Sequence, residues 1–150
     1  MDKQLTLEPF DRIYLDKSFE WMQNPLLLRL IDGRPTTRAE QLEWFDSLKY
    51  KPSYKIWGLA CNGIPAGACG LKGIDGTTGE LFCYIGEQKL WGGNGKQIIK
   101  LIEEQANVLR LTSIHLKVLH ENERAKALYV KSNFKVTGQD AKFLYMKKSL

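Results

Sequence analysis

A glycine-rich turn between two apolar runs has the composition of an anion-binding loop. The turn 91–95, WGGNG, follows the apolar run 81–85 and precedes a long helical pattern. Glycines let a backbone turn tightly and approach a ligand closely, and the N–H groups that open the next helix attract negative charge. The sequence therefore predicts a phosphate site made by backbone N–H groups, those of Gly92, Gly93, Asn94, Gly95 and Lys96.

The residues around this turn predict a strand before it and a helix after it. Apolar residues recur with a period of about 3.6 and define one helix face; they are Ile98, Ile99, Ile102, Ala106 and Leu109. A strand at 113–118, a polar turn at 120–123, a second helix carrying Tyr129 and another strand after Phe134 follow in that order. A glycine turn between a strand and a helix is a weak signal alone, and the order of the later elements makes it specific.

In this order of elements the chain closely resembles the GNAT superfamily of acyl-CoA-dependent N-acetyltransferases. The family's pyrophosphate-loop motif, Q/R-x-x-G-x-G/A, falls on residues 90–95, LWGGNG, and its second motif falls on 118–129, VLHENERAKALY. The family pattern runs from Gly93 to Phe134 without a gap. Leu90 stands where the family usually has Gln or Arg, so that side-chain contact is missing or is supplied by Lys89 or Lys96.

The resemblance implies a binding mode for acetyl-CoA. Strand residues equivalent to Cys83, Tyr84 and Ile85 pair with the pantetheine arm, and one of their N–H groups polarises the acetyl carbonyl. Asn122 would cap the second helix and contact the pantetheine. The residues assigned to the cofactor are Cys83, Tyr84, Ile85, Leu90, Gly92, Gly93, Asn94, Gly95, Lys96, Asn122 and Ala125.

The resemblance also implies two catalytic side chains. Tyr129 lies at the family's catalytic tyrosine; with an ordinary pKa near 10, its hydroxyl is protonated at neutral pH and can protonate a leaving thiolate. A buried aromatic on an amphipathic helix is the structural alternative. Glu80, which begins the strand before the glycine turn, is the candidate base. Glu87 and solvent are the alternative bases. The structural alternative is that Glu80 is an ordinary exposed acid at the edge of the strand, with no catalytic role.

The rest of the chain predicts one domain, 1–150, of the α/β (α+β) class. Its GNAT-like sheet is expected to be mixed and mostly antiparallel, with about seven strands flanked by about four helices. Strands are predicted at 5–8, 54–61, 64–74 and 80–85, with turns at 62–63 and 75–79. A helix is predicted at 11–24, ended by Pro25, and a second one is capped by Thr36 or Thr37 with Glu40 as its N3 acid.

Composition and charge narrow the class of protein. The chain has 150 residues, 43% hydrophobic and 26% charged, which is ordinary globular usage. No apolar run approaches the roughly 20 residues of a membrane span and the first residues open no signal peptide, so a soluble, cytoplasmic protein is predicted. Lys and Arg exceed Asp and Glu by 22 to 17 but are scattered, which favours a polyanionic cofactor over nucleic acid.

The cysteines and histidines predict no metal site. Cys61, Cys69 and Cys83 lie in apolar, strand-like runs, no pair has C-x-x-C spacing, and their number is odd. They are expected to be reduced core residues rather than covalent catalysts. The two histidines, His115 and His120, are too few for a histidine-based metal site.

The acceptor amine is the least determined part of the prediction. The regions 19–25 and 37–48 resemble the branch that contains ribosomal-protein N-terminal acetylases and nucleotide-linked amino-sugar acetylases of bacterial surface-glycan pathways. The short length of the chain, together with the residues at 111–116 and 133–134, favours the amino-sugar acetylases and therefore a small-molecule acceptor. A peptide N-terminal acetylase stays open, as does a non-catalytic acyl-CoA-binding module, which Leu90 supports. Either a monomer or a homodimer is expected.

Overall fold

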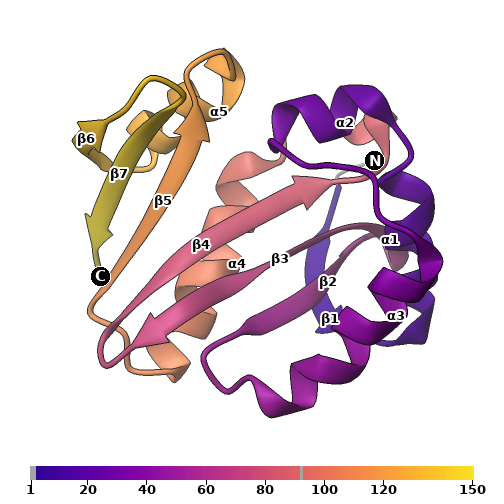
Figure 1. The fold of residues 1–150 in the computed structure, drawn as a ribbon. Coiled ribbons are helices and arrows are strands. Elements are labelled where there is room, and N and C mark those ends of the chain that lie inside the picture. Colours follow the sequence, from indigo (N-terminus) through magenta and orange to yellow (C-terminus); the bar gives the residue numbers. More distant parts are fainter. Residues whose placement is uncertain (1–2, 92) are drawn as a thin grey trace.

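Strands and helices alternate along the chain and assemble one seven-stranded sheet with helices on both faces (Figure 1). The computed structural model describes residues 3–91 and 93–150. The strands are β1 (Leu5–Pro9), β2 (Lys55–Cys61), β3 (Ile64–Asp75), β4 (Thr78–Ile85), β5 (Ser113–Leu119), β6 (Lys135–Gln139) and β7 (Phe143–Ser149). The helices are α1 (Arg12–Trp21), α2 (Pro25–Leu30), α3 (Arg38–Ser47), α4 (Gly95–Val108) and α5 (Glu123–Lys131), with 3₁₀ turns η1 (Leu48–Tyr50) and η2 (Gln88–Leu90).

The strand order is β1-β2-β3-β4-β5-β7-β6. Every neighbouring pair is antiparallel except β4 and β5, which run parallel. The predicted fold class, a mixed and mostly antiparallel sheet of seven strands, is confirmed. The described residues form five α-helices where about four were expected.

Helices cover the sheet unequally. In Figure 1, α4 lies behind the sheet, whereas α1 and α3 lie in front of the strands of the N-terminal half. The predicted apolar face of α4 is buried against the main core, with Ile102 and Ala106 at 0% exposure. The side chains of α5 that face inward, among them Leu128, pack against that same core. The front of β5, β7 and β6 therefore has no helix on it within the described parts of the chain.

The two parallel strands pair over a short distance only. Their register joins Thr78 with Ser113, Gly79 with Ile114 and Glu80 with His115, and it ends there. Both strands continue past this point, β4 to Ile85 and β5 to Leu119, so they diverge (Figure 1). An opening between two strands leaves backbone N–H and C=O groups on their facing edges without ladder partners.

Helix α2 was missed in the sequence. Asn24 and Pro25 were interpreted as the end of the first helix, but they also begin a new one. The Asn24 side chain accepts from the N–H of Leu26, and Pro25 occupies the first turn, a combination that favours helix starts. Six residues are too few to show helical periodicity.

Two other local predictions have different outcomes. The capping box of α3 is confirmed: Thr37 Oγ1 accepts from the N–H of Glu40, whose carboxylate accepts from the N–H of Thr37. The turn predicted at 75–79 is shorter than expected, because Asp75 pairs with Thr78 across a two-residue connection. Thr78 then belongs to β4, where it joins the register with β5.

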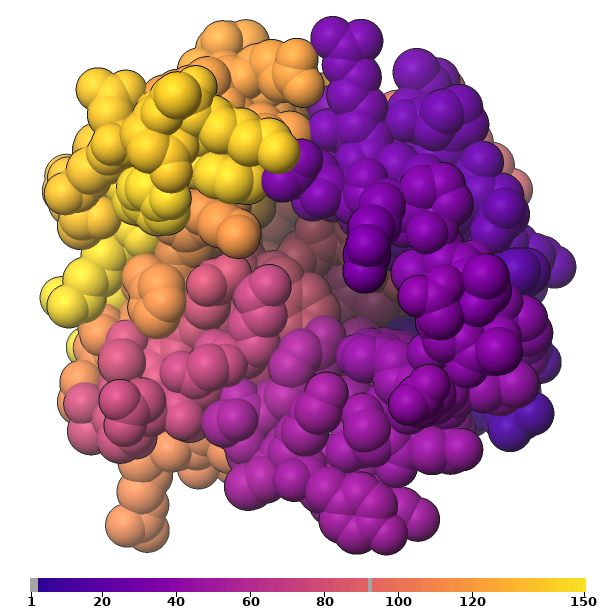
Figure 2. All heavy atoms as spheres, viewed as in Figure 1, coloured from indigo at the N-terminus to yellow at the C-terminus, as the bar shows by residue number. Residues whose placement is uncertain are grey.

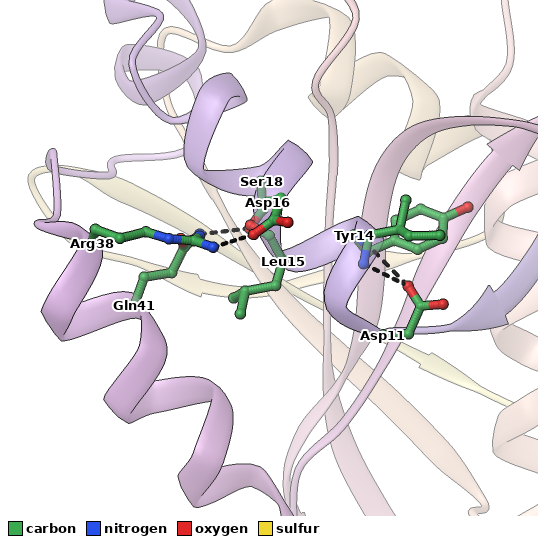
Figure 3. Close-up of polar contacts among 8 residues, drawn as sticks. Asp11, Tyr14, Leu15, Asp16, Ser18, Arg38 and Gln41 are labelled. Atoms are coloured by element: carbon green, nitrogen blue, oxygen red, sulfur yellow. Dashed lines mark hydrogen bonds and ion pairs between the residues drawn. The ribbon is translucent and has the colours of Figure 1, made fainter.

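A polar network fixes α3 against α1. Figure 3 shows Arg38 and Gln41 reaching from α3 to Asp16 and Ser18 on α1. Gln41 Nε2 donates to Ser18 Oγ at 2.6 Å, and that hydroxyl donates to the carbonyl of Leu15 at 2.7 Å. Ser18 and Gln41 are both buried, so these hydrogen bonds satisfy polar groups that would otherwise be costly to bury.

Close contact between β2 and α1 generates a stability prediction. A Cβ added to Gly58 would lie 2.4 Å from ring atoms of the buried Tyr14. We expect Gly58→Ala to lower the free energy of unfolding by roughly 1–3 kcal/mol, the usual cost of overpacking. Gly138→Ala is the control, because its Cβ would meet no atom within 4 Å. Urea denaturation of both variants tests this; equal stabilities would contradict the packing argument.

Candidate active site

A cleft opens where β4 leaves β5. Its volume is about 220 Å³, and it is lined by β4, α2, the start of α4 and the first turns of α5. We refer to this cavity as the strand cleft. The residues predicted from the sequence that line it are Cys83, Tyr84, Ile85, Gly93, Gly95, Asn122, Ala125 and Tyr129. Three other predicted cofactor residues, Leu90, Asn94 and Lys96, are not in its lining, and Gly92 lies outside the described residues.

The backbone edge of β4 faces this cleft. The N–H of Gly86 donates to the carbonyl of Ala66 at 2.7 Å, on the β3 side. The Ile85 carbonyl belongs to the same trans peptide unit and therefore points to the opposite side, where Trp91 Nε1 donates to it at 2.8 Å. Because backbone groups alternate along a strand, the N–H and C=O of Cys83 share the cleft-facing edge. An extended ligand can add here as if it were another strand.

Gly93, in the glycine turn, has a backbone conformation that favours glycine. Gly93 has φ +81°, and a Cβ placed on it would meet no atom within 4 Å. Its backbone therefore faces open space in the cleft lining. The Asn94 side chain is buried and donates to the carbonyl of Leu90 at 2.8 Å, which ties the loop to the residue before it. Leu90 thus serves the loop through its backbone.

Gly95 has a packing role in addition to its place in the cleft. A Cβ on it would lie 2.3 Å from Leu128 Cδ2, so only glycine lets the start of α4 approach α5 this closely. The first N–H groups of a helix have no partner within the helix. The start of α4 lies at the cleft through Gly95, and the phosphate site predicted for its N–H groups stays a prediction.

Tyr129 places its ring between the core and the cleft. The ring packs edge-on against Phe134 with centroids 5.6 Å apart, while the residue also lines the cleft. Burial raises the pKa of Tyr129 above its ordinary value, and the nearby Cys83 thiol adds to this. Among the described residues the Tyr129 hydroxyl has no hydrogen-bond partner. None of these residues has a fully buried side-chain oxygen without a partner, so the Tyr129 hydroxyl is in contact with solvent. The hydroxyl is therefore protonated at neutral pH and accessible from the cleft.

Asn122 connects the two halves of the site. Its Oδ1 accepts from the N–H of Ala125 at 3.2 Å, which caps α5 as predicted. Its Nδ2 donates to the carbonyl of Leu30 at 3.4 Å, at the end of α2. Two exposed ion pairs, Arg29–Glu121 at 3.3 Å and Lys142–Asp32 at 2.7 Å, span the same gap.

The candidate base is not beside the candidate acid. Glu80 lies where the β4–β5 pairing ends and forms an ion pair with Lys72 at 3.5 Å. Alternation along β4 puts its side chain on the face opposite to Cys83, and it does not line the strand cleft. Glu87, the alternative, accepts from Trp21 Nε1 at 3.1 Å. Tyr129 lines the strand cleft, and neither carboxylate does.

A second cavity of about 500 Å³ lies on the front of the sheet, between the N-terminal helices and β4. We call it the aromatic pocket because Trp44, Tyr54, Phe82 and Tyr84 line it. Figure 2 shows a hollow in the middle of this face, between the segment after α2 and the strands β4 and β5. Arg34, Lys72 and Glu40 contribute the charged side chains.

The two cavities meet at β4. Ile31, Cys83 and Tyr84 line both of them. Burial raises the pKa of Cys83 to about 12 and keeps the Tyr84 hydroxyl protonated by raising its pKa. Cys83 is therefore a neutral thiol at pH 7, which agrees with a structural role and not with a covalent nucleophile.

Several lining residues were not singled out from the sequence. Leu27, Leu30 and Ile31 come from the unexpected α2 and its end, and Arg124 comes from the first turn of α5. Arg124 brings a cation to the cleft, whereas Lys89 and Lys96, the suggested substitutes for the family's Gln or Arg, do not line it. Trp44 lines the aromatic pocket, and Tyr50, also from the N-terminal half, is 76% exposed. The Asn24-Pro25 start signal was the available clue to α2.

Residues 3–91 and 93–150 contain no group of three or more His, Cys, Asp or Glu side chains placed to hold a metal ion. The three cysteines are free thiols. Among the same residues, no helix is long and apolar enough to cross a membrane.

Comparison with known proteins agrees with this geometry. The acetyltransferase (GNAT) domain family matches residues 4–135. No curated protein sequence matches the chain. The fold is similar to that of spermidine N-acetyltransferase from Vibrio cholerae in complex with CoA and spermine, with TM-score 0.90 and 19% identity over 97% of this chain and 95% of that one.

Two further solved structures share the fold. The N-acetyltransferase PseH of Campylobacter jejuni, in complex with acetyl coenzyme A, has TM-score 0.77 and 17% identity over 97% of this chain and 99% of that one. Aminoglycoside acetyltransferase AAC(6')-Ib, in complex with coenzyme A, has TM-score 0.80 and 19% identity over 99% of this chain and 95% of that one.

The chain belongs to the acetyltransferase (GNAT) domain family, since the family match covers residues 4–135 of 150. The expected enzyme class, an acetyl-CoA-dependent N-acetyltransferase, is confirmed at the level of this family. Coenzyme A, the expected co-substrate, is bound in structures that share the fold. The particular branch and acceptor remain predictions.

The glycine loop generates a prediction with a matched control. Gly93 and Gly63 both have φ +81° and no atom within 4 Å of an added Cβ, but only Gly93 lines the strand cleft. Alanine at either position should cost roughly 1–2 kcal/mol of backbone strain. We expect only Gly93→Ala to weaken coenzyme A binding, by at least about tenfold, because its methyl group would project where a phosphate approaches the backbone.

Isothermal titration with coenzyme A and urea denaturation of both variants separate binding from stability. A Gly93→Ala protein that binds coenzyme A as tightly as Gly63→Ala would show that the loop has only a structural role.

Proposed function

We propose that this protein transfers the acetyl group of acetyl-CoA to a primary amine by direct attack in a ternary complex. The junction of the two cavities at Cys83 and Tyr84 is the observation that carries this proposal. A thioester in the strand cleft and an amine in the aromatic pocket would meet there without a covalent enzyme intermediate. The raised pKa of the Cys83 thiol supports this, because a protonated thiol is a poor nucleophile.

The site's residues fit the requirements of acetyl-CoA. The free edge of β4 would bind the pantetheine arm, and the loop at Gly93 with the start of α4 would hold the pyrophosphate, with Arg124 as a further cation at the cleft. A backbone N–H on the cleft edge of β4 would polarise the acetyl carbonyl. Asn122, held between Ala125 and Leu30, would contact the pantetheine.

Proton transfers complete the reaction. As the amine nitrogen bonds to the carbonyl carbon, the carbon–sulfur bond breaks and Tyr129 donates its proton to the departing thiolate. The incoming amine gives up its own proton to Glu80, Glu87 or water. Glu80 can reach an amine only from the front of the sheet, because it shares that face with Phe82 and Tyr84, which line the aromatic pocket.

The acceptor we propose is a small molecule, in particular a nucleotide-linked amino sugar. The aromatic pocket supports this choice because it combines ring faces with Arg34 and with Lys72, which Glu80 pairs. Among the described residues, its lining offers polycations such as polyamines and aminoglycosides one carboxylate, Glu40, which the capping box engages. The structural neighbours named for spermidine and aminoglycosides therefore share the fold without indicating this acceptor.

Binding of the co-substrate should stabilise the fold. A ligand that binds only the native state adds RT ln(1 + [L]/Kd), about 2.7 kcal/mol at a hundredfold excess over Kd. We expect millimolar acetyl-CoA to raise Tm in a thermal scan. An unchanged Tm would count against the proposed co-substrate. The Gly63→Ala protein is the positive control: its substitution lies outside the strand cleft, so acetyl-CoA should raise its Tm by the full amount.

Tyr129→Phe separates an enzyme from a non-catalytic acyl-CoA-binding module. The substitution removes one O–H donor and keeps the ring that packs on Phe134, so Tm and coenzyme A affinity should change little. The chemical-step rate should fall by roughly 10²- to 10⁴-fold, the usual contribution of a general acid. Thiol release under single-turnover conditions measures it; an unchanged rate would return Tyr129 to a packing role.

The pH profile provides an independent test of the same assignment. Because the pKa of Tyr129 is raised, its acid form persists beyond the ordinary tyrosine value of about 10. We therefore expect kcat to show no alkaline decline from Tyr129 between about pH 7 and 10. A decline in that range that disappears in Tyr129→Phe would contradict the raised pKa.

A further inference from the structure

The front of the sheet carries a row of polar and charged residues that extends beyond the acetyl-transfer site. The registers of five neighbouring strands align Lys72, Glu80, His115, Lys147 and Lys135, one from each of β3, β4, β5, β7 and β6. Residues paired across strands project from the same face of a sheet. The row therefore runs across the front from the aromatic pocket, at Lys72, to the outer strand of the C-terminal half.

The C-terminal end of this row is uncovered. No helix of residues 3–91 and 93–150 lies in front of β5 and β7 (Figure 1), and the side chains of Lys117, Lys135 and Lys147 are exposed. Phe143 and Tyr145 share this face of β7 with Lys147, and Lys117 Nζ lies 4.9 Å from the centre of the Phe143 ring. We refer to Lys117, Lys135 and Lys147 as the lysine face.

The charges of the lysine face are not balanced within the chain. Lys135 and Lys147 are directly opposite each other, an arrangement that destabilises a sheet when the charges have the same sign. In the part of the chain that the structure describes, none of the three lysines forms an ion pair. Two nearby acids are engaged elsewhere: Glu80 pairs with Lys72, and Asp140 accepts from the Tyr145 hydroxyl and from backbone N–H groups.

We propose that the lysine face binds the phosphate groups of the acceptor, whose amine is then presented at the junction of the two cavities. This inference rests on the proposed acetyl transfer and adds a phosphate subsite to it. Lysine binds phosphate as a point charge, without the bidentate geometry that favours arginine for carboxylates. A phosphate here would also relieve the repulsion between Lys135 and Lys147.

The spacing suits an amine linked to phosphate within one small molecule. Neighbouring strands lie about 4.8 Å apart, so β7 is roughly 10 Å from β4 along this row. A lysine side chain extends over part of that distance. The junction of the two cavities at Cys83 lies three residues, roughly 10 Å, beyond Glu80 along β4. An acceptor with its phosphates on the lysine face must therefore extend past Glu80, where β4 and β5 separate, to place its amine at the junction.

The same charges oppose the other occupants of an open sheet face. A second copy of the chain placed face to face would bring the two lysine faces together and add to the repulsion. A polyamine would be repelled in the same way. A phosphate-bearing amine is the occupant whose charge complements the face.

Acetylation of matched acceptors tests the subsite. Glucosamine, glucosamine 6-phosphate and UDP-glucosamine are compared in the wild type, in Lys135→Gln/Lys147→Gln and in Lys100→Gln. Lys100 is the control because it is an exposed lysine of α4, on the opposite side of the sheet. We expect the double variant to raise KM for the phosphorylated acceptors at least about tenfold, with kcat and the KM for glucosamine changed less than about twofold.

These comparisons also distinguish the source of the phosphate. A preference for UDP-glucosamine over glucosamine 6-phosphate would indicate a nucleotide-linked acceptor, and the reverse order a sugar phosphate. Equal KM values for phosphorylated and unphosphorylated acceptors in the wild type would overturn the proposal. So would a double variant that behaves like Lys100→Gln.

A binding measurement keeps this test independent of turnover. UDP and inorganic pyrophosphate are titrated separately into the protein with coenzyme A at saturation, so that the glycine loop is not the site observed. Wild type and Lys100→Gln should bind UDP, and Kd should rise at least tenfold in the double variant while its Tm stays the same or increases. If no amine is acetylated but this difference in Kd is seen, the proposed acetyl transfer fails and the phosphate site stands. If neither probe binds to the wild type, the phosphate site fails.

Discussion

The short pairing between β4 and β5 is the constraint on which the rest of the site depends. The two strands share a register over three residue pairs and then part. Parallel neighbours that stayed paired would satisfy the β4 edge and leave no space for a ligand. Because they part, the backbone of Cys83 and Ile85 faces a cleft, α4 brings its first turn to that cleft, and α5 brings Tyr129.

Apolar and charged surfaces are separated by the two faces of the sheet. The isoleucines of α4 and the inward side of α5 are buried against the rear face. The residues that line the strand cleft are therefore mostly apolar. Raised pKa values of Cys83 and Tyr129 follow from that burial. The front face instead carries Lys72, Glu80 and the lysine face. A thioester and a charged acceptor can therefore approach β4 from opposite sides.

Helix α2 links the two halves that the divergence separates. Leu27 is buried on the N-terminal side, and the carbonyl of Leu30 accepts from Asn122 on the C-terminal side. The ion pairs Arg29–Glu121 and Lys142–Asp32 are exposed, and such pairs contribute at most about 1 kcal/mol each. Leu27 therefore anchors α2 to the N-terminal half, and the hydrogen bond from Asn122, with these ion pairs, connects it across the opening.

Local pattern and motif resemblance determined much of this protein. The period of the apolar residues identified α4, and the resemblance of the glycine turn and the second motif to the family's motifs singled out Gly93, Asn122 and Tyr129, because each signal lies within a single strand–turn–helix segment. The structure places these three residues in the lining of one cleft. Only the tertiary structure decided where Glu80 points and what it meets, since the β3–β4 register pairs it with Lys72. The aromatic pocket and the lysine face likewise combine side chains from elements distant in sequence, and no local periodicity encodes such neighbours.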